Sequence, residues 1–217
     1  MRNKAAVAGR FMIVKDDFYD DVNTVIETAH AFKYSTFDEY TGYHSLTVYH
    51  PRGIVGKLER LLGVPITRWD KDPSEGNGVF YLGLSRGRNS ETPGIHWDDP
   101  EDDVTVLIYL TQGLADAFGT SMWRHKKTGL TGAPTRSDCH RIGKPIGKVR
   151  DLLEADSTNR AKWIETDRIG YRFNRMVAYP SGMLHSASRH YGSTLSDGRL
   201  YQTYRIAVNW KKARFAR

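Results

Sequence analysis

Residues 94–98 hold a histidine and an aspartate, His96 and Asp98, two positions apart. In an extended segment, residues i and i+2 point to the same side, so one metal ion can contact both side chains. A second histidine, His185, follows an apolar run much later in the chain. Two imidazoles and one carboxylate on one face of a metal, with the other positions open, suit non-haem Fe(II) and its chemistry with oxygen. We therefore take these three side chains as a candidate metal triad.

The strands expected around the triad strengthen this interpretation. A His-x-Asp pair alone is not specific, because many histidines are half-buried structural residues. Residues 104–110, shortly after the pair, are rich in β-branched and aromatic side chains, as in a buried strand. After His185, Gly198-Arg199 opens a second strand-like run, residues 200–210. Arg199 therefore stands at the start of a strand that follows the second histidine.

The order of these features resembles the iron and 2-oxoglutarate-dependent dioxygenases of the prolyl-hydroxylase-like type. The shared features are His-x-Asp, a strand ending in Tyr-Leu, Gly119-Thr120, a late histidine, and Gly-Arg at the start of another strand. Together they cover roughly residues 77–210. The sequence departs from the pattern at Phe118, where a second glycine often stands, and in the longer interval between His185 and the arginine.

The resemblance implies an oxygenase that binds Fe(II) through His96, Asp98 and His185 and uses 2-oxoglutarate as co-substrate. It implies hydroxylation of an unactivated C–H bond by O2, with release of succinate and CO2. The substrate would be a small molecule, an amino acid or a peptidyl side chain. Asp98 favours hydroxylation over halogenation, because a carboxylate fills the metal position that a halide would need.

Four residues are candidates for binding 2-oxoglutarate. Its distal carboxylate needs a planar cation that donates two hydrogen bonds, which arginine supplies better than lysine. Arg199 is the first choice. Arg205 lies on the same face of the expected strand, three alternations later, and is a candidate for the other end of the oxoacid or an exposed strand residue. The hydroxyls of Thr203 and Tyr81 are further candidate donors, with packing as the alternative role for each.

The length of 217 residues predicts one domain with a sizeable core. We expect an α+β fold that is mainly β, a double-stranded β-helix (a cupin-like jelly roll), within residues 1–217. Residues 1–75 are expected to be a helical support region and residues 76–210 the jelly-roll core. Glycines and prolines mark an insertion at about 126–173, with one helix near its middle and another starting at Trp163. An insertion between the halves of a site often selects the substrate, although a purely structural role is equally compatible.

Charge and composition limit the classes of partner that the protein can have. The net charge of +7 and the pI near 9.4 are compatible with nucleic acid, an anionic substrate or a solvated surface, and we favour the solvated surface. The single cysteine, Cys139, excludes an intramolecular disulfide. The sequence has no apolar run near the length of a membrane span, so we expect a soluble cytoplasmic protein without a membrane partner.

Three alternative functions stay open. Residues 199–205 read Arg-x-Tyr-x-Thr-x-Arg and resemble the Arg-x-Asn-x-Thr-x-Arg signature of the AlkB-like nucleic-acid demethylases, with Tyr201 in place of the asparagine. A non-catalytic jelly-roll binding module would use the histidines as structural residues. A cupin-like metal enzyme would bind a metal without 2-oxoglutarate. The last two share the expected fold, so the fold does not separate them from the oxygenase.

Overall fold

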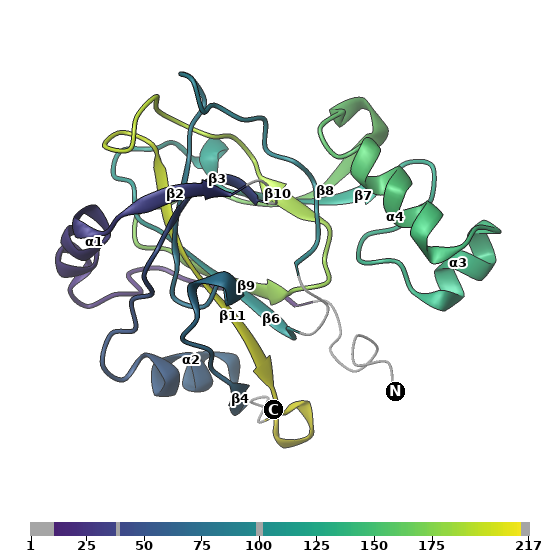
Figure 1. The fold of residues 1–217 in the computed structure, drawn as a ribbon. Helices are drawn as coiled ribbons and strands as arrows, with labels where there is room; N and C mark the ends of the chain where they lie inside the picture. The colour runs from purple at the N-terminus through teal and green to yellow at the C-terminus, as the bar shows by residue number, and fades with distance from the viewer. Residues whose placement is uncertain (1–10, 38–39, 99–101, 214–217) are drawn as a thin grey trace.

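The structure, a computed structural model, describes residues 11–37, 40–98 and 102–213. Within these ranges the larger sheet has the strand order β1-β9-β6-β11-β5-β3-β2, and β4 adds to β11. The smaller sheet has the order β10-β7-β8. In Figure 1 the smaller sheet lies across from β9, β6 and β11 of the larger one. The fold is therefore α+β, with antiparallel strands in two sheets, and is consistent with a sandwich; jelly-roll connectivity stays a prediction.

The elements have the following bounds. The strands of the larger sheet are β1 (Ile13–Lys15), β2 (Tyr34–Phe37), β3 (Tyr40–Ser45), β4 (Ile66–Arg68), β5 (Phe80–Gly83), β6 (Val104–Tyr109), β9 (Met176–Pro180) and β11 (Arg199–Val208). Those of the smaller sheet are β7 (Thr120–His125), β8 (Trp163–Ile169) and β10 (His185–Ala187). The α-helices are α1 (Val22–Ala31), α2 (Ile54–Leu62), α3 (Arg136–Ile142) and α4 (Ile146–Ala155). The described residues also form short 3-10 helices at η2 (Pro73–Glu75), η3 (Asp116–Phe118), η4 (Arg160–Lys162) and η5 (Trp210–Lys212).

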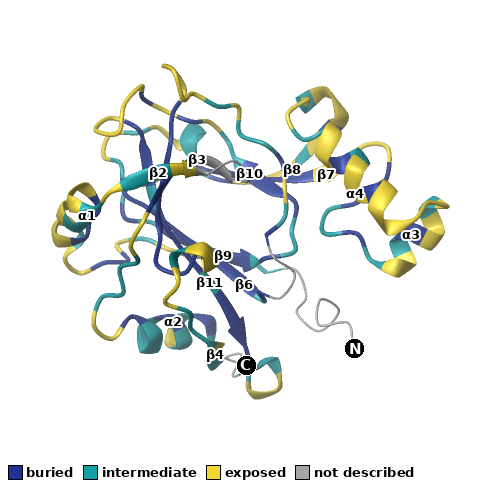
Figure 2. Cartoon of the chain, viewed as in Figure 1, coloured by how far each residue is buried: buried dark blue, intermediate teal, exposed yellow. Residues whose placement is uncertain are grey.

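Strand β11 links the core to the candidate site. It pairs with β5 along one edge and with β6 along the other, so it is a central strand of the larger sheet. Because successive side chains alternate between faces, one set packs into the main hydrophobic core: Leu200, Tyr204, Ile206 and Val208. The other set faces the smaller sheet and starts with Arg199. Figure 2 shows these strands as the buried centre of the molecule.

The helices α1 and α2 support the back of the larger sheet. Asp21 caps α1 by accepting a hydrogen bond from the Thr24 amide at 3.1 Å. Helix α2 buries Ile54, Leu58 and Leu62 on one face, at the spacing of a helical stripe, in the same core as β11. Within the described part of the chain, no helix is long and apolar enough to cross a membrane.

The N-terminal region contains more strand than expected. Helices α1 and α2 provide the helical part that was expected of residues 1–75. The same region also supplies β2, β3 and β4 to the larger sheet. A description of residues 1–75 as a helical support region is therefore incomplete. The first ten residues and the last four lie outside the described residues.

The insertion differs from the prediction at its C-terminal end. The helix predicted to start at Trp163 is wrong, because residues 163–169 form β8 and pair with β7 along its length. Pairing with a neighbouring strand satisfies the backbone groups here, and β-branched Ile164 and Thr166 suit an extended segment. The helix expected near the middle of the insertion is α4, and α3 precedes it. We call residues 124–162 the insertion lobe.

Candidate metal centre

The two histidines of the triad are neighbours along the backbone hydrogen bonds. The His96 amide donates to the His185 carbonyl at 3.0 Å, and the His185 amide donates to the His96 carbonyl at 2.8 Å. This antiparallel bridge adds the His96 segment to the free edge of β10, whose other edge pairs with β7. The Asp98 amide donates to the Ser181 carbonyl at 2.9 Å, two residues further along. Residues far apart in sequence are thus brought together by one short ladder.

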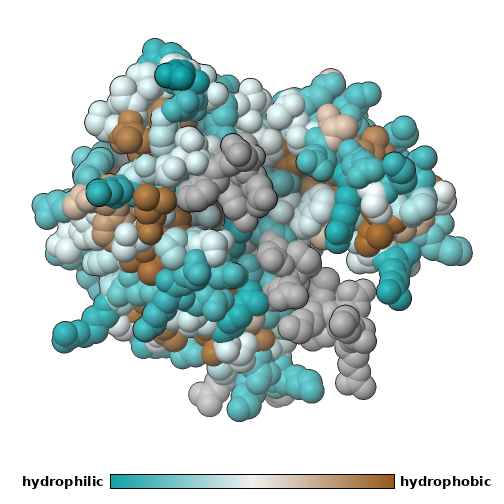
Figure 3. All heavy atoms as spheres, in the orientation of Figure 1, coloured by the Kyte–Doolittle hydropathy of each residue, from teal (hydrophilic) through white to brown (hydrophobic). Residues whose placement is uncertain are grey.

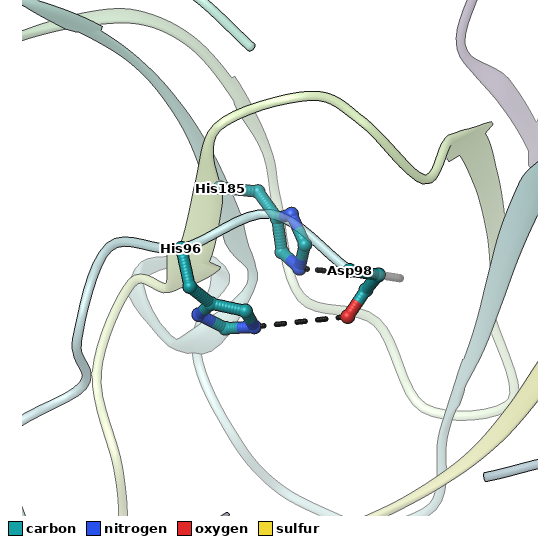
Figure 4. Close-up of side chains that lie close together, drawn as sticks. All are labelled: His96, Asp98 and His185. Carbon is teal, nitrogen blue, oxygen red and sulfur yellow. Dashed lines mark ion pairs between the residues drawn. The ribbon is translucent and has the colours of Figure 1, made fainter. Parts of the chain in front are cut away.

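The three side chains converge as a metal site requires. One ligand atom from each of His96, Asp98 and His185 lies within 4.8 Å of the other two. The Nε2 atom of His96 is 3.8 Å from Asp98 Oδ1, and that of His185 is 3.6 Å from Asp98 Oδ2 (Figure 4). The Asp98 and His185 side chains are buried, whereas the His96 side chain is 54% exposed. The group is therefore compatible with a metal ion that is reached from the His96 side.

Backbone carbonyls orient both imidazoles in the same way. The Nδ1 atom of His96 lies 3.0 Å from the Gly94 carbonyl, and that of His185 lies 2.9 Å from the Met183 carbonyl. A carbonyl oxygen only accepts, so in each neutral ring Nδ1 carries the proton and donates it. The Nε2 lone pair is then directed at the centre of the triad. Such hydrogen bonds fix the tautomer and orientation of metal-binding histidines.

The buried ligands have the protonation states that a metal needs. Burial by itself would raise the pKa of Asp98, but Arg205, the two histidines and a hydrogen bond from Thr105 lower this pKa to about 2. Arg205 Nη2 donates to Asp98 Oδ1 at 3.0 Å, and Thr105 Oγ1 donates to Oδ2 at 2.5 Å. Burial lowers the pKa of His185 to about 4. At neutral pH the carboxylate is ionised and this imidazole is neutral, as metal coordination demands.

A cavity of about 100 Å³ connects the triad with Arg199. Strand β11 forms one wall with every second residue: Arg199, Tyr201, Thr203 and Arg205. Neighbouring strands add Tyr81, His44, Thr105, Leu107 and Tyr179, and the smaller sheet adds Thr120 and Ala187. All seven residues predicted from the sequence as site residues line this cavity.

Arg199 carries a buried charge without a carboxylate partner. The residue is 1% exposed. Its Nε donates to the Phe118 carbonyl at 2.8 Å and its Nη2 to the Gly119 carbonyl at 3.2 Å. Its guanidinium carbon lies 4.8 Å from the centre of the Tyr201 ring and 5.3 Å from that of Tyr109. Among the described residues, no carboxylate oxygen lies within 4.0 Å of its nitrogens. A buried cation of this kind is costly unless an anion joins it.

The Gly-Thr segment of the sequence pattern now has a physical reason. A Cβ atom on Gly119 would lie 1.9 Å from the Ile169 carbonyl oxygen, so only glycine allows this approach of β7 to β8. The carbonyl of the same residue accepts from Arg199. The next side chain, Thr120, shares a hydrogen bond of 2.7 Å with the Tyr109 hydroxyl. This segment positions the arginine.

The remaining predicted residues, Arg205, Thr203 and Tyr81, have partners within the protein. Arg205 pairs with Asp98 at the metal end. The Thr203 hydroxyl donates to the Gly76 carbonyl at 2.7 Å, so its proton is already engaged. The Tyr81 ring stacks on Tyr201, with centroids 5.4 Å apart.

Sequence reasoning missed Tyr179, which lines the cavity beside His185. Its hydroxyl is buried and has no hydrogen-bond partner among the described residues, and the Nε of Arg205 is in the same condition. Burial keeps the pKa of Tyr179 well above 10, so the hydroxyl is a donor. The only sequence signal was its position six residues before His185, at the end of an apolar run.

The sequence matches a known protein family. A family model described as a family of unknown function (DUF6445) matches residues 92–206. The matched stretch contains the candidate metal triad and all of the cavity wall contributed by β11. No curated protein matches the chain.

Proposed function

The chain belongs to the DUF6445 family, whose function is not known, and we propose that it is an Fe(II)- and 2-oxoglutarate-dependent oxygenase that hydroxylates an unactivated C–H bond. The observation that carries the proposal is Arg199, a buried guanidinium without a carboxylate partner in the same cavity as the triad. A metal site alone would suit many enzymes. A metal site that shares a small cavity with an uncompensated cation suits a metal-binding acid.

The other unsatisfied groups of the cavity fit a dicarboxylate. The Tyr179 hydroxyl and the Nε of Arg205 are buried donors without partners at the metal end, and Arg199 is a donor at the opposite end of the β11 wall. Donors at both ends complement a molecule with an acceptor group at both ends. 2-Oxoglutarate has this form, with its oxoacid group directed to the metal and its distal carboxylate to Arg199.

Each residue then has a defined task. His96, Asp98 and His185 would hold Fe(II) through two neutral imidazoles and one carboxylate. Arg199 would bind the distal carboxylate, and Arg205 would hold Asp98 in its ionised form while donating toward the oxoacid. When bound, the metal and 2-oxoglutarate supply an oxidation by O2 in which one oxygen atom enters the substrate and the other enters succinate, with loss of CO2. The exposed His96 side marks the direction of substrate approach.

The test is anaerobic binding of Fe(II) followed by 2-oxoglutarate, observed by visible absorption. We expect a charge-transfer band that needs both additions. His185→Ala is expected to lose the metal and the band. Arg199→Met is expected to keep the metal and to need at least about 100-fold more 2-oxoglutarate, because it removes a charge-assisted bidentate contact of about 3 kcal/mol.

An exposed arginine serves as the matched control. Arg189→Met removes one positive charge outside the cavity and is expected to leave the band unchanged. Iron binding without a 2-oxoglutarate band in the wild type would favour a metal enzyme that does not use this co-substrate. A wild-type protein that bound no iron would reject the oxygenase and favour a binding module.

A further inference from the structure

The excess positive charge of the chain is concentrated in the insertion lobe. Residues 124–162 contain ten Lys and Arg against four Asp and Glu, a net charge of +6. The rest of the chain contains 22 Lys and Arg against 21 Asp and Glu, a net charge of +1. The charge is therefore not spread evenly over a solvated surface. One lobe carries almost all of it.

Most of these cations are exposed and have no acidic partner. The exposed members are Arg124, Lys126, Lys127, Arg136, Arg141, Lys144, Lys148, Arg150 and Lys162. Only Arg141 and Lys148 form ion pairs within the lobe, with Asp138 at 3.4 Å and Asp151 at 3.3 Å. In the part of the chain that the structure describes, no carboxylate lies within 4.0 Å of the other seven. Their repulsion is relieved only by an external anion or by salt.

Four of the cations gather where β7 ends and β8 begins. The Lys126 amide donates to the Lys162 carbonyl at 2.9 Å, which places the two residues side by side. Lys127 follows in the turn, and Arg124 is the last exposed residue of β7. We call Arg124, Lys126, Lys127 and Lys162 the hairpin cluster.

The hairpin cluster borders the smaller sheet, which also carries His185. Arg124 is two residues beyond Met122, and Met122 pairs with His185 across β7 and β10. The lobe is also fastened to the other histidine segment, because the Ile95 amide donates to the Ser157 carbonyl at 3.0 Å. The lobe and the candidate metal centre are therefore adjacent in the fold.

The surface chemistry favours nucleic acid over an acidic protein. Protein interfaces bury an apolar core, with aromatic and aliphatic anchors. Between residues 124 and 169, the exposed large apolar side chains among the described residues are Ile146 and Ile164 alone. In Figure 3 the visible face of α3 and α4 is mainly hydrophilic. Exposed cations without an apolar anchor suit the regular charge of a phosphate backbone.

We propose that the insertion lobe is a nucleic-acid-binding surface, on which the hairpin cluster contacts backbone phosphates next to the metal centre. Binding depends on charge and not on base sequence. The inference rests on the lobe alone and does not depend on the identity of the metal or on 2-oxoglutarate. It assigns to the insertion a role in holding a nucleic acid, whether as substrate or as partner.

The test uses metal-free full-length protein and a fluorescently labelled single-stranded DNA of about 20 nucleotides, long enough to cover several phosphate contacts. The lobe variant combines Lys126→Glu, Lys127→Glu and Lys162→Glu. The control variant combines Lys33→Glu, Arg52→Glu and Lys71→Glu, which makes the same charge change at exposed positions outside the lobe. Circular dichroism and iron binding verify that both variants keep the fold and the triad.

We expect wild-type binding that weakens steeply with salt. The lobe variant is expected to lose at least about tenfold in affinity and to reduce the slope of log K against log salt by about 2, since each lost contact to a single strand removes about 0.7. The DNA affinity of the control variant is expected to stay within about threefold of the wild type.

Equal losses in both variants, or no DNA binding at low salt, would overturn the proposal. Competition by polyglutamate as strong as by unlabelled DNA would also overturn it, in favour of an acidic protein. Because no metal is present, failure here leaves the oxygenase proposal untouched.

Discussion

Arg205 donates to Asp98 Oδ1 at 3.0 Å, so the carboxylate of the triad is already half of an ion pair. The Asp98 side chain is 3% exposed and the Arg205 side chain 17% exposed. The pairing stabilises the ionised carboxylate inside the protein and keeps the ligand ready for a cation. It also means that the metal-free protein contains no isolated buried charge at this position.

Replacement of this arginine should therefore destabilise the metal-free protein more than the metal-bound protein. Arg205→Met leaves a buried carboxylate without its partner, and we expect a loss of about 3–5 kcal/mol in the free energy of unfolding. A bound divalent cation replaces the missing charge, so the loss should shrink at saturating Mn(II). Urea unfolding with and without Mn(II) measures both. Arg175→Met, which breaks a more exposed pair with Asp16, should lose the same small amount in both conditions. A loss for Arg205→Met that Mn(II) did not reduce would contradict the electrostatic account.

The neutral state of His185 predicts a pH dependence of the metal-free fold. Burial lowers the pKa of this histidine from 6.5 to about 4. Between these values the unfolded chain binds more protons than the folded protein, so stability falls as the pH falls. The loss from pH 7 to pH 4.5 should be about 2–3 kcal/mol from this group. In His185→Gln that part should disappear, and urea midpoints at the two pH values test it. Asp98, with a pKa of about 2, contributes only at lower pH.

Gly119 should tolerate no side chain. A Cβ atom there would lie 1.9 Å from the Ile169 carbonyl oxygen and would push β7 away from β8. We expect Gly119→Ala to cost about 2–4 kcal/mol of stability and to weaken 2-oxoglutarate binding, because the carbonyls that hold Arg199 would move. Gly147→Ala in α4 is the matched control. It meets nothing within 4 Å and should stabilise by about 0.5–1 kcal/mol. Thermal unfolding compares the two, and equal effects would be inconsistent with the packing argument.

The sequence predicted the parts of the site that depend on local spacing. His96 and Asp98 could be recognised because alternation in a strand needs only two residues. The cavity-lining face of β11 could be recognised for the same reason. Arg199, Thr203 and Arg205 are separated by even numbers of positions, so their side chains point to the same face of a strand. Composition also predicted β6 and β11, whose β-branched and aromatic residues suit buried strands.

The rest depends on partners that are distant in the chain. In residues 163–169 the β-branched Ile164 and Thr166 suit a strand, but three charged residues stand among them, and it is pairing with β7 that decides the structure. The ladder between His96 and His185 joins segments that no short pattern relates. The prediction placed Arg205 on the correct face, but its pairing with Asp98 follows from the close approach of two separate segments.

Tyr179 gives the most direct test of a ligand in the cavity, because stability and binding should change in opposite directions. Its buried hydroxyl has no partner among the described residues, so removing it relieves the cost of burying an unpaired polar group. Tyr179→Phe should therefore leave the metal-free protein unchanged or stabilise it by up to about 1 kcal/mol. If the hydroxyl donates to the oxoacid, the same variant should bind 2-oxoglutarate about 3–10-fold more weakly, with iron binding unchanged.

The control variant, Tyr109→Phe, breaks the 2.7 Å hydrogen bond to Thr120 and should lose about 1 kcal/mol of stability. Calorimetric titration and urea unfolding on both variants separate the two effects. A Tyr179→Phe protein with lower stability and unchanged 2-oxoglutarate affinity would show that the hydroxyl has a structural partner and does not contact the co-substrate.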